Sequence, residues 1–399
     1  MQSPEIITDQ QRLEACCKTW RAAGAFAFDT EFIRDDTYNA TLCLVQVTVD
    51  GATALIDPTC ELDLAPFWDL VTDKSVVVIV HAGKEDFEVC LRATGKVPRN
   101  VFDVQIAAGF VGLGYPLSLL RLVERVTHRR IIKGQTLTDW LHRPLTPEQV
   151  RYATEDVIYL PDVYRTLRAE LERMGRLAWA EEEFRRFEDP DFYRAPAAER
   201  VRRLKGSSKL DGLGLLVLER LVEWRERWAQ SRNRPTRALI RDDILVEIAR
   251  RRPQQARELE VLRGFPQAKN RKVVHELVGI IKAACQTPKS EWPTPREHRD
   301  DPPMTRALLD LLSAVIQAIC HEEKLNWPLL GSPQRLRELL DYHAGRSGEI
   351  PPLLRGWREQ FIGRRLLDLL EGRCRLHVSG WPDNPRLHLN EHPPARKGS

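Results

Sequence analysis

The sequence lacks several patterns that are typical of secreted proteins, of proteins with a structural zinc site and of membrane proteins. Its eight cysteines include no Cys-x-x-Cys pair, which argues against a zinc site or a disulfide framework and favours a reducing cytoplasm. No apolar run approaches the roughly 18 residues of a membrane-spanning helix. The N-terminus lacks the basic-then-apolar pattern of a secretory signal, and there is no sign of repeats or low complexity. These absences predict a cytoplasmic protein with no membrane partner.

Charge is distributed unevenly along the 399 residues, although the formal net charge is only +4. Residues 1–170 carry 18 Lys and Arg against 24 Asp and Glu, whereas residues 200–290 carry 22 against 10. An acidic module followed by a basic one suits a protein that acts on polyanions, because basic side chains bind phosphates whatever the base sequence. The length and the 42% content of hydrophobic residues predict two or three folded domains.

The most informative pattern is a pair of acids, Asp29 and Glu31, within an apolar stretch. Residues two apart point to the same face of a β-strand, so the two carboxylates would lie side by side, opposite Phe26, Phe28 and Thr30. Adjacent carboxylates repel each other unless a cation lies between them, and Mg²⁺ or Mn²⁺ prefers oxygen ligands. A solvated pair on an edge strand is the simpler alternative for an isolated Asp-x-Glu.

Two further acids stand in contexts that fit the first pair. Asp86 falls in a predicted first helical turn shortly after the β-branched run 76–80, at the strand end where ligands gather in open α/β sheets. Complementing the helix dipole is its simpler role. Asp156 lies one turn after Tyr152, on a predicted helix whose capping box spans residues 146–149. The side chains of Tyr152 and Asp156 therefore share one helical face.

Taken in order, these motifs resemble the DEDDy branch of the DEDD 3′-to-5′ exonucleases, and most specifically ribonuclease D. Tyrosine in the third motif, where the sister branch has histidine, indicates the branch. The resemblance covers nearly all of residues 1–195, and its departures at Val104 and at Asn39-Ala40 touch no predicted metal ligand. The motifs that carry it are Asp29-Thr-Glu-Phe-Ile33, Tyr38-x-x-x-Leu-Cys-Leu-Val-Gln46, Asp57-Pro58, Phe102-Asp-Val-Gln105, Thr138-Asp-Trp140, Arg143-Pro-Leu145 and Tyr152-x-x-x-Asp156.

This resemblance implies a metal-dependent hydrolase that releases nucleoside 5′-monophosphates from RNA with a free 3′ end. Four carboxylates would hold two divalent ions, Mg²⁺ or Mn²⁺, as in two-metal phosphoryl hydrolysis. A tyrosine has an ordinary pKa of about 10, so we expect Tyr152 to position the attacking water and not to act as a base. The predicted catalytic residues are Asp29, Glu31, Asp86, Tyr152 and Asp156, and the predicted metal ligands are Asp29, Glu31, Asp86 and Asp156.

The sequence beyond the predicted nuclease is helical. Residues 208–286 contain Leu-x-x-Trp-Arg-Glu, an Asn-x-Pro break and Asp-Asp-Ile-Leu, and so resemble an HRDC domain, the helical module that ribonuclease D shares with RecQ helicases. Residues 304–372 resemble a second, divergent module of the same type, and residues 373–399 predict a β-hairpin and a tail. A helical spacer or an interaction platform is the simpler alternative for both modules.

We therefore expect an α/β fold, with a ribonuclease H-like mixed sheet followed by two all-α HRDC-type modules. Residues 24–33, 41–49 and 52–57 predict an antiparallel meander, and the strand at 76–80 enters the sheet through a helix. The expected function is that of a 3′-to-5′ exoribonuclease that trims RNA, with tRNA precursors implied by the family and a monomer favoured. A DNA 3′-to-5′ exonuclease and a non-enzymatic RNA-binding adapter remain alternatives.

Overall fold

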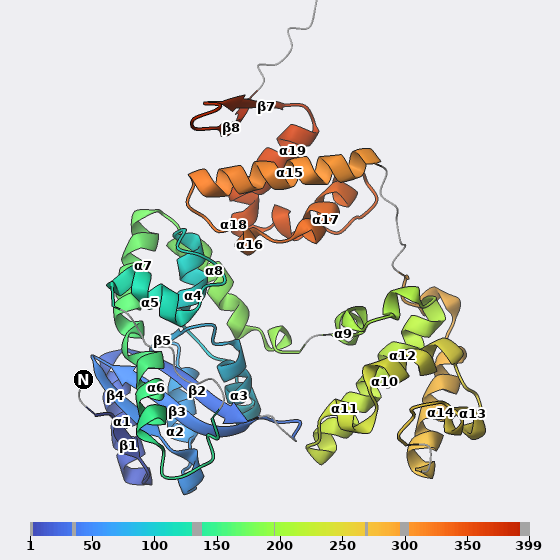
Figure 1. Ribbon diagram of the computed structural model, residues 1–399, viewed down its shortest axis with the longest axis horizontal. Coiled ribbons are helices and arrows are strands. Elements are labelled where there is room, and N and C mark those ends of the chain that lie inside the picture. The colour runs from blue at the N-terminus through green and yellow to red at the C-terminus, as the bar shows by residue number, and fades with distance from the viewer. Residues whose placement is uncertain are drawn as a thin grey trace, which may run out of the picture. The chain divides into compact units, whose positions relative to one another are not determined.

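The computed structural model describes most of the chain (Figure 1). The described residues are 3–33, 37–129, 138–194, 196–267, 270–295 and 303–391, so the predicted tail beyond residue 391 lies outside them. The chain divides into two compact units. The first unit combines residues 1–31, 44–189 and 300–399, and the second combines residues 32–43 and 190–299.

A mixed sheet of six strands lies at the centre of the first unit. The strands are β1 (Glu5–Ile7), β2 (Ala25–Ile33), β3 (Thr41–Val49), β4 (Ala52–Ile56), β5 (Val77–Val80) and β6 (Val101–Asp103). Their order is β1-β4-β3-β2-β5-β6, with β3 antiparallel to β4 and with β5 parallel to both β2 and β6. The predicted mixed α/β fold is confirmed. The helix expected before β5 is also present, at Ala65–Val71.

Different helices cover the two faces of β2. The helices of this N-terminal part are α1 (Gln10–Ala23), α2 (Ala65–Val71), α3 (Lys84–Thr94), α4 (Val104–Phe110), α5 (Leu119–Thr127), α6 (Pro147–Ile158), α7 (Leu160–Arg173) and α8 (Leu177–Phe184). On one face, Phe28 packs with Phe67 of α2 and Phe87 of α3, with ring centroids 5.6 and 5.8 Å apart. Ala27, on the opposite face, belongs to the hydrophobic cluster built by α4–α8.

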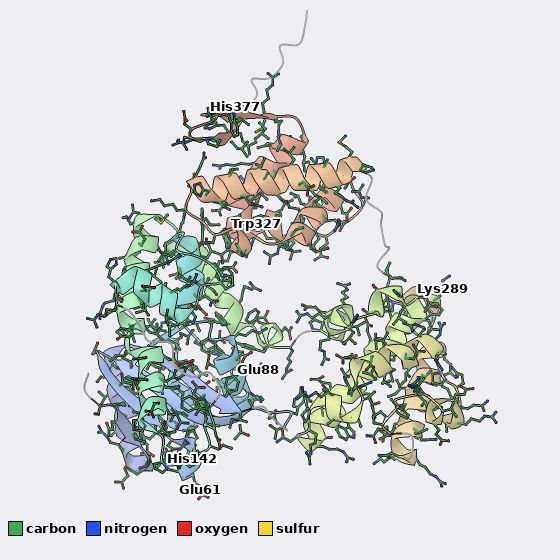
Figure 2. The ribbon with its side chains drawn as sticks, in the orientation of Figure 1. Glu61, Glu88, His142, Lys289, Trp327 and His377 are labelled. Carbon is green, nitrogen blue, oxygen red and sulfur yellow. The ribbon has the colours of Figure 1, made fainter. Side chains whose placement is uncertain are left out.

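The C-terminal helices pack against this N-terminal part, within the same unit. They are α15 (Pro303–Glu322), α16 (Trp327–Leu330), α17 (Pro333–His343), α18 (Gly356–Arg358) and α19 (Arg364–Leu370), and the predicted hairpin follows as β7 (Cys374–Ser379) and β8 (Arg386–Glu391). One hydrophobic cluster contains Phe110 and Phe184 together with Leu329 and Trp357. α16, which begins at Trp327 (Figure 2), contacts α4. Residues 303–370 therefore complete the core of the N-terminal part.

Glu183 of α8 is a buried polar link between these two parts. Its Oε1 accepts a hydrogen bond from Trp357 Nε1 at 2.8 Å and from Arg358 Nη1 at 2.6 Å. Arg358 Nη2 also donates to the carbonyl oxygen of Leu329 at 2.8 Å. Burial raises the pKa of Glu183, but the hydrogen bond and charge of Arg358 outweigh that effect, so the pKa lies below its usual value. The carboxylate is consequently charged and paired inside the core.

The second unit is helical. Its helices are α9 (Ala197–Arg203), α10 (Gly212–Arg232), α11 (Thr236–Leu239), α12 (Asp242–Arg251), α13 (Ala256–Glu260) and α14 (Arg271–Cys285). α10 begins after Asp211, whose side chain accepts from the backbone N–H of Gly214, and ends at Asn233 in the left-handed conformation. Leu221, Leu245 and Leu277, from α10, α12 and α14, are fully buried in one hydrophobic cluster. These contacts give the unit a core of its own.

α15 is the one helix in the described part of the chain that is long and apolar enough to cross a membrane. Length and composition are weak evidence, because the core helix of a soluble protein passes the same test. Leu312, Val315 and Ile316 of α15 are at most 1% exposed and belong to the hydrophobic cluster shared with α4–α8. α15 therefore serves as a core helix of this fold.

Candidate active site

Asp29 and Glu31 lie near the end of β2, two residues apart as the sequence predicts. Side chains alternate along a strand, so both carboxylates continue the face of Ala27, the face that α6 and α7 cover. Both residues are partly exposed, whereas Thr30 between them is buried. The strand thus presents two acids on one side and a hydroxyl on the other.

Asp86 lies in the first turn of α3, directly after β5, and is 6% exposed. The hydroxyl of Thr30 donates a hydrogen bond to its Oδ1, which links β2 to α3. The turn before it contains Gly83, where an added Cβ would lie 2.6 Å from Cγ2 of Val80. Only glycine fits so close to the strand, and this tight turn places Asp86 just beyond the carboxyl end of β5.

Tyr152 and Asp156 lie one turn apart on α6. Thr146 caps this helix and forms the predicted capping box with Gln149, which fixes where the helix begins and hence which face carries the two residues. α6 ends at Ile158, and α7 begins two residues later with a proline in its first turn. The side-chain interaction between Tyr152 and Asp156 raises the pKa of the tyrosine and lowers that of the acid.

The four predicted metal ligands influence one another electrostatically. Burial raises the pKa of Glu31 to about 8, and the charges of Asp156 and Asp86 add to that increase. Burial also raises the pKa of Asp29 well above its ordinary value, with further increases from Asp86, Asp156 and Glu31. The pKa of Asp86 rises to about 6 and that of Asp156 to about 7, each mainly because of burial. The charges of Asp86 and Asp156 therefore act on both acids of β2.

The chemistry of this donor set suits a hard divalent cation. Among the described residues, no ion pair involves Asp29, Glu31, Asp86 or Asp156. The repulsion among these acids is therefore not offset by a paired cationic side chain in the described part of the chain. Nor does any group of three or more acidic, histidine or cysteine side chains there have the geometry of a preformed metal site. All eight cysteines are free thiols. The residues fit oxygen-liganded ions such as Mg²⁺ or Mn²⁺ by donor type, and binding would have to draw them closer.

Tyr152 is unsuited to act as a general base. Burial raises its pKa, and the nearby charges of Asp156, Glu31 and Asp29 raise it further. Its ring lies 6.0 Å from the ring of Trp140, at an interplanar angle of 45°. The tyrosine therefore keeps its proton and is packed against a second aromatic ring.

Two features of this site were missed by the sequence reasoning. The strand pattern predicts only that Thr30 lies on the face opposite the two acids, whereas in the structure its hydroxyl binds Asp86. The signal that could have indicated this contact is a hydroxyl residue between two acids. The contact of Trp140 with Tyr152 has no local sequence signal. His81, next to the Asp86 helix, is bound to the carbonyl oxygen of Leu117 at 2.9 Å. The histidine thus has a structural partner and lies outside the predicted catalytic set.

Comparison with known proteins finds relatives over almost the whole chain. A family model described as 3′-5′ exonuclease matches residues 4–172, and a model of the HRDC domain matches residues 215–281. The chain is 31% identical over 384 residues to ribonuclease D of Bartonella henselae, covering 96% of this chain and 94% of that protein. It is 36% identical over 373 residues to ribonuclease D of Pseudomonas paraeruginosa, covering 92% and 98%.

Solved structures give the same picture. The crystal structure of Escherichia coli RNase D, described as an exoribonuclease involved in structured RNA processing, matches with a TM-score of 0.79. Its sequence is 30% identical, and the match covers 92% of this chain and 99% of that one. A protein from Bifidobacterium adolescentis shares the fold at a TM-score of 0.65 and 22% identity. The similarity therefore includes the C-terminal helices as well as the sheet.

Proposed function

Because the chain belongs to the ribonuclease D family of 3′-to-5′ exoribonucleases, we propose that its chemistry is carried out by the five residues gathered around β2 and α6. One observation above all supports this assignment: the charges of Asp86 and Asp156 raise the pKa of both Asp29 and Glu31, and those of Asp156, Glu31 and Asp29 raise the pKa of Tyr152. The proposed catalytic residues are Asp29, Glu31, Asp86, Tyr152 and Asp156.

The four acids would hold two divalent ions, Mg²⁺ or Mn²⁺. When bound, such ions supply an acidified water as the nucleophile and stabilise the charge that develops on the leaving oxygen. The protein's part is to keep the carboxylates ionised. Thr30 contributes directly, because its hydrogen bond to Asp86 lowers the pKa of that acid against the effect of burial. Tyr152 does the same for Asp156.

Tyr152 would orient the attacking water. If its hydroxyl donates to Asp156, with which it interacts, the lone pairs of the phenolic oxygen would accept a hydrogen bond from water. This arrangement aims the water without deprotonating it, in keeping with a pKa above the ordinary value for tyrosine. By analogy with the family, Glu31 would face the hydroxyl of the terminal ribose, which would make a free 3′ end necessary.

The reaction is hydrolysis of the terminal phosphodiester. The water oxygen forms a bond to phosphorus, the bond from phosphorus to the preceding 3′ oxygen breaks, and that oxygen takes up a proton. The released nucleotide carries the phosphate at its 5′ position. The shortened strand keeps a free 3′ hydroxyl, so the cycle can repeat.

We propose RNA with a free 3′ end as the substrate, with tRNA precursors included, and a monomeric enzyme acting in the cytoplasm. The assigned parts are an exonuclease domain at 1–195, an HRDC domain at 208–286, a divergent HRDC-like module at 304–372 and a hairpin with a tail at 373–399. Residues 200–290 carry 22 Lys and Arg against 10 Asp and Glu, which suits binding to the phosphates of RNA.

A matched pair of strands tests this proposal. RNA and DNA of one sequence, with a label at the 5′ end, are incubated with Mg²⁺ or Mn²⁺, and the products are resolved by length. We expect RNA to be shortened from its 3′ end, nucleoside 5′-monophosphates to accumulate, and a 3′-phosphorylated RNA to resist. Turnover in excess EDTA would remove the metal mechanism. Preferential degradation of DNA would favour a DNA exonuclease, and binding without cleavage would favour an adapter.

A further inference from the structure

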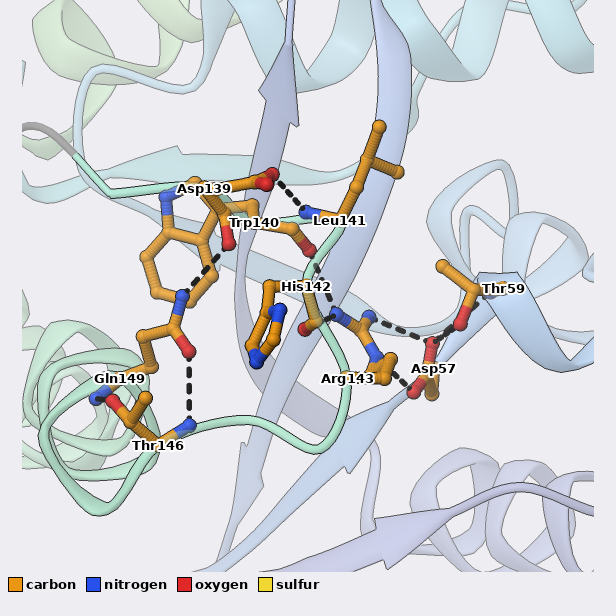
Figure 3. A network of polar contacts seen from close by, with 9 residues as sticks. All are labelled: Asp57, Thr59, Asp139, Trp140, Leu141, His142, Arg143, Thr146 and Gln149. Atoms are coloured by element: carbon orange, nitrogen blue, oxygen red, sulfur yellow. Dashed lines mark hydrogen bonds and ion pairs between the residues drawn. The ribbon is translucent and has the colours of Figure 1, made fainter.

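The loop that carries Trp140, residues 138–146, is tied to the sheet by an ion pair. Arg143 binds both carboxylate oxygens of Asp57, with Nε 2.5 Å from Oδ2 and Nη2 2.8 Å from Oδ1 (Figure 3). Asp57 follows β4 directly and is 3% exposed, whereas the side chain of Arg143 is 24% exposed. The fork of a guanidinium matches a carboxylate in this two-bond geometry, which fixes orientation as well as distance.

The same guanidinium also shapes the loop itself. Arg143 Nη1 donates to the carbonyl oxygens of Trp140 at 2.7 Å and of His142 at 2.9 Å. Asp57 is held in turn by Thr59, whose backbone N–H and hydroxyl both donate to Oδ1, at 3.0 and 2.6 Å. Arg143 therefore joins a carboxylate at the sheet to the main chain beside Trp140. Loss of the arginine would remove its hydrogen bonds to the two carbonyl oxygens and to the carboxylate, whose Oδ1 would keep only those from Thr59.

The opposite end of the loop is tied to α6, the helix that carries Tyr152. Gln149 Nε2 donates to the carbonyl oxygen of Asp139 at 3.0 Å, while its Oε1 accepts from the backbone of Thr146 (Figure 3). Gln149 Nε2 also donates to Thr138 Oγ1 at 2.9 Å. Asp139 also accepts from the backbone of Leu141 at 2.9 Å. The loop is thus anchored to the sheet at one end and to the catalytic helix at the other.

Between these anchors, the indole of Trp140 is 7% exposed and lies against the ring of Tyr152. A phenol ring on a helix can turn about its side-chain bonds, and a neighbouring ring limits that movement. We propose that Arg143 and Asp57 are positioning residues for the Tyr152 hydroxyl, acting through Trp140. This inference rests on the proposed function, in which that hydroxyl orients the attacking water. A misplacement of about 1 Å at such a group costs on the order of 10²-fold in rate.

A double-mutant cycle separates positioning from general support of the fold. The kinetic constants kcat and KM for 5′-labelled RNA are measured for the wild type, Arg143→Gln, Tyr152→Phe and the double variant. We expect Arg143→Gln to lower kcat by about 10- to 100-fold, with KM within about twofold of the wild-type value. In the Tyr152→Phe background the same substitution should cost no further rate, because the hydroxyl it would misplace is gone.

Arg99→Gln is the matched control. Arg99 forms a 2.7 Å ion pair with Glu188 and, among the described residues, has no hydrogen bond or ion pair with the Trp140 loop. The two partners are 89 residues apart in the sequence, a separation similar to the 86 residues between Arg143 and Asp57. It should leave kcat unchanged. Trp140→Phe is the second variant, in case Arg143→Gln does not fold; it keeps an aromatic ring but withdraws the contact. Its loss of kcat should also vanish in the Tyr152→Phe background.

The outcomes distinguish this inference from the proposed function. If Tyr152→Phe lowers kcat and Arg143→Gln lowers it by the same factor in the Tyr152→Phe background as in the wild type, the inference is wrong and the catalytic assignment stands. If Arg143→Gln changes KM alone, the pair acts on substrate binding and the inference is again wrong. If Tyr152→Phe turns over at the wild-type rate, the role of the tyrosine fails, and the inference fails with it.

Discussion

The hydroxyl of Thr30 donates a hydrogen bond to the carboxylate of Asp86 and thereby couples the middle of β2 to the first turn of α3. This bond opposes the effect of burial on the pKa of Asp86. Thr30 therefore favours the ionised acid that a divalent cation requires, although it does not itself belong to the predicted ligand set.

Thr30→Val should weaken metal activation. A hydrogen bond to a charged group contributes about 1.5 kcal/mol, which corresponds to roughly a tenfold change in affinity. We expect the Mg²⁺ concentration for half-maximal activity to rise by about that factor, with near-normal kcat once Mg²⁺ saturates. Thr30→Ser, which keeps the hydroxyl, is the control. An unchanged Mg²⁺ requirement in Thr30→Val would show that the bond has no part in metal binding.

The metal-free protein should lose stability as the pH rises. The folded pKa is raised to about 8 for Glu31, about 7 for Asp156 and about 6 for Asp86. A carboxyl whose folded pKa lies above its unfolded value stabilises the fold while protonated, and that contribution disappears as the pH passes through the folded pKa. We expect the Tm in EDTA to fall between about pH 5 and 8 relative to Asp156→Asn, and Mg²⁺ to restore it.

The comparison with Asp156→Asn cancels the titration of unrelated groups, because both proteins share them. The variant should be the more stable of the two at pH 8 without metal, and it should be inactive. Parallel curves of Tm against pH for the two proteins would contradict the electrostatic picture of the site.

Tyr152→Phe should fold and still bind metal at saturating concentrations, but it should lose most of its rate. Only the hydroxyl is removed, so the ring contact with Trp140 is kept. Removing one positioned hydrogen bond of this kind costs on the order of 10²–10³ in kcat. Single-turnover kinetics with saturating Mn²⁺ measure the effect on the chemical step. A rate within a factor of about two of the wild type would reduce Tyr152 to a packing residue.

Breaking the buried pair between Glu183 and Arg358 should destabilise the protein without touching the active site. Removing one partner of a buried ion pair costs about 3–5 kcal/mol when the other charge is left uncompensated. Glu183 would keep Arg186 at 3.1 Å from its Oε2, so we expect the lower end of that range. We expect Arg358→Ala to lower the free energy of unfolding by that amount in urea titrations. Arg364→Ala, which removes a 3.0 Å exposed pair with Glu359, is the control and should change stability by less than about 1 kcal/mol.

The basic second unit should contribute affinity for RNA and not chemistry. Replacing residues 196–295 by a flexible linker removes most of the basic excess but leaves the core that residues 303–370 complete. We expect KM to rise, kcat on short RNA to stay similar, and the dependence of binding on salt to flatten. A simple truncation after residue 195 is a poorer experiment, because it also removes Trp357 and Leu329 from the shared cluster. Unchanged RNA affinity in the linker variant, with loss of an oligomer in sizing, would favour a protein-binding role.

Local patterns predicted much of this structure because their causes are local. The capping box at Thr146 and Gln149, the spacing of Asp29 and Glu31, and the β-branched run of β5 each depend on neighbouring residues, and each is present. The family resemblance and the mixed α/β fold are also confirmed. The assignment of the five catalytic residues stays a prediction that the geometry supports.

Long-range contacts could not be predicted in this way. Arg143 and Asp57 are 86 residues apart, and each alone reads as an ordinary charged residue near a turn. The contact of Trp357 with Glu183 spans 174 residues and depends on how two helical surfaces fit together. Hydrophobic periodicity shows that a helix has an apolar face but does not identify the surface that covers it.

The shared core has a consequence for synthesis of the protein. The N-terminal part is synthesised first. The hydrophobic cluster of its helices α4 and α8 is complete only when Trp357 and Leu366 are present. A chain released early would expose Phe110 and Phe184 and would be a target for proteases before it could act on RNA. The core around α4 and α8 is thus completed only after the segment that contains Trp357 and Leu366 has been synthesised.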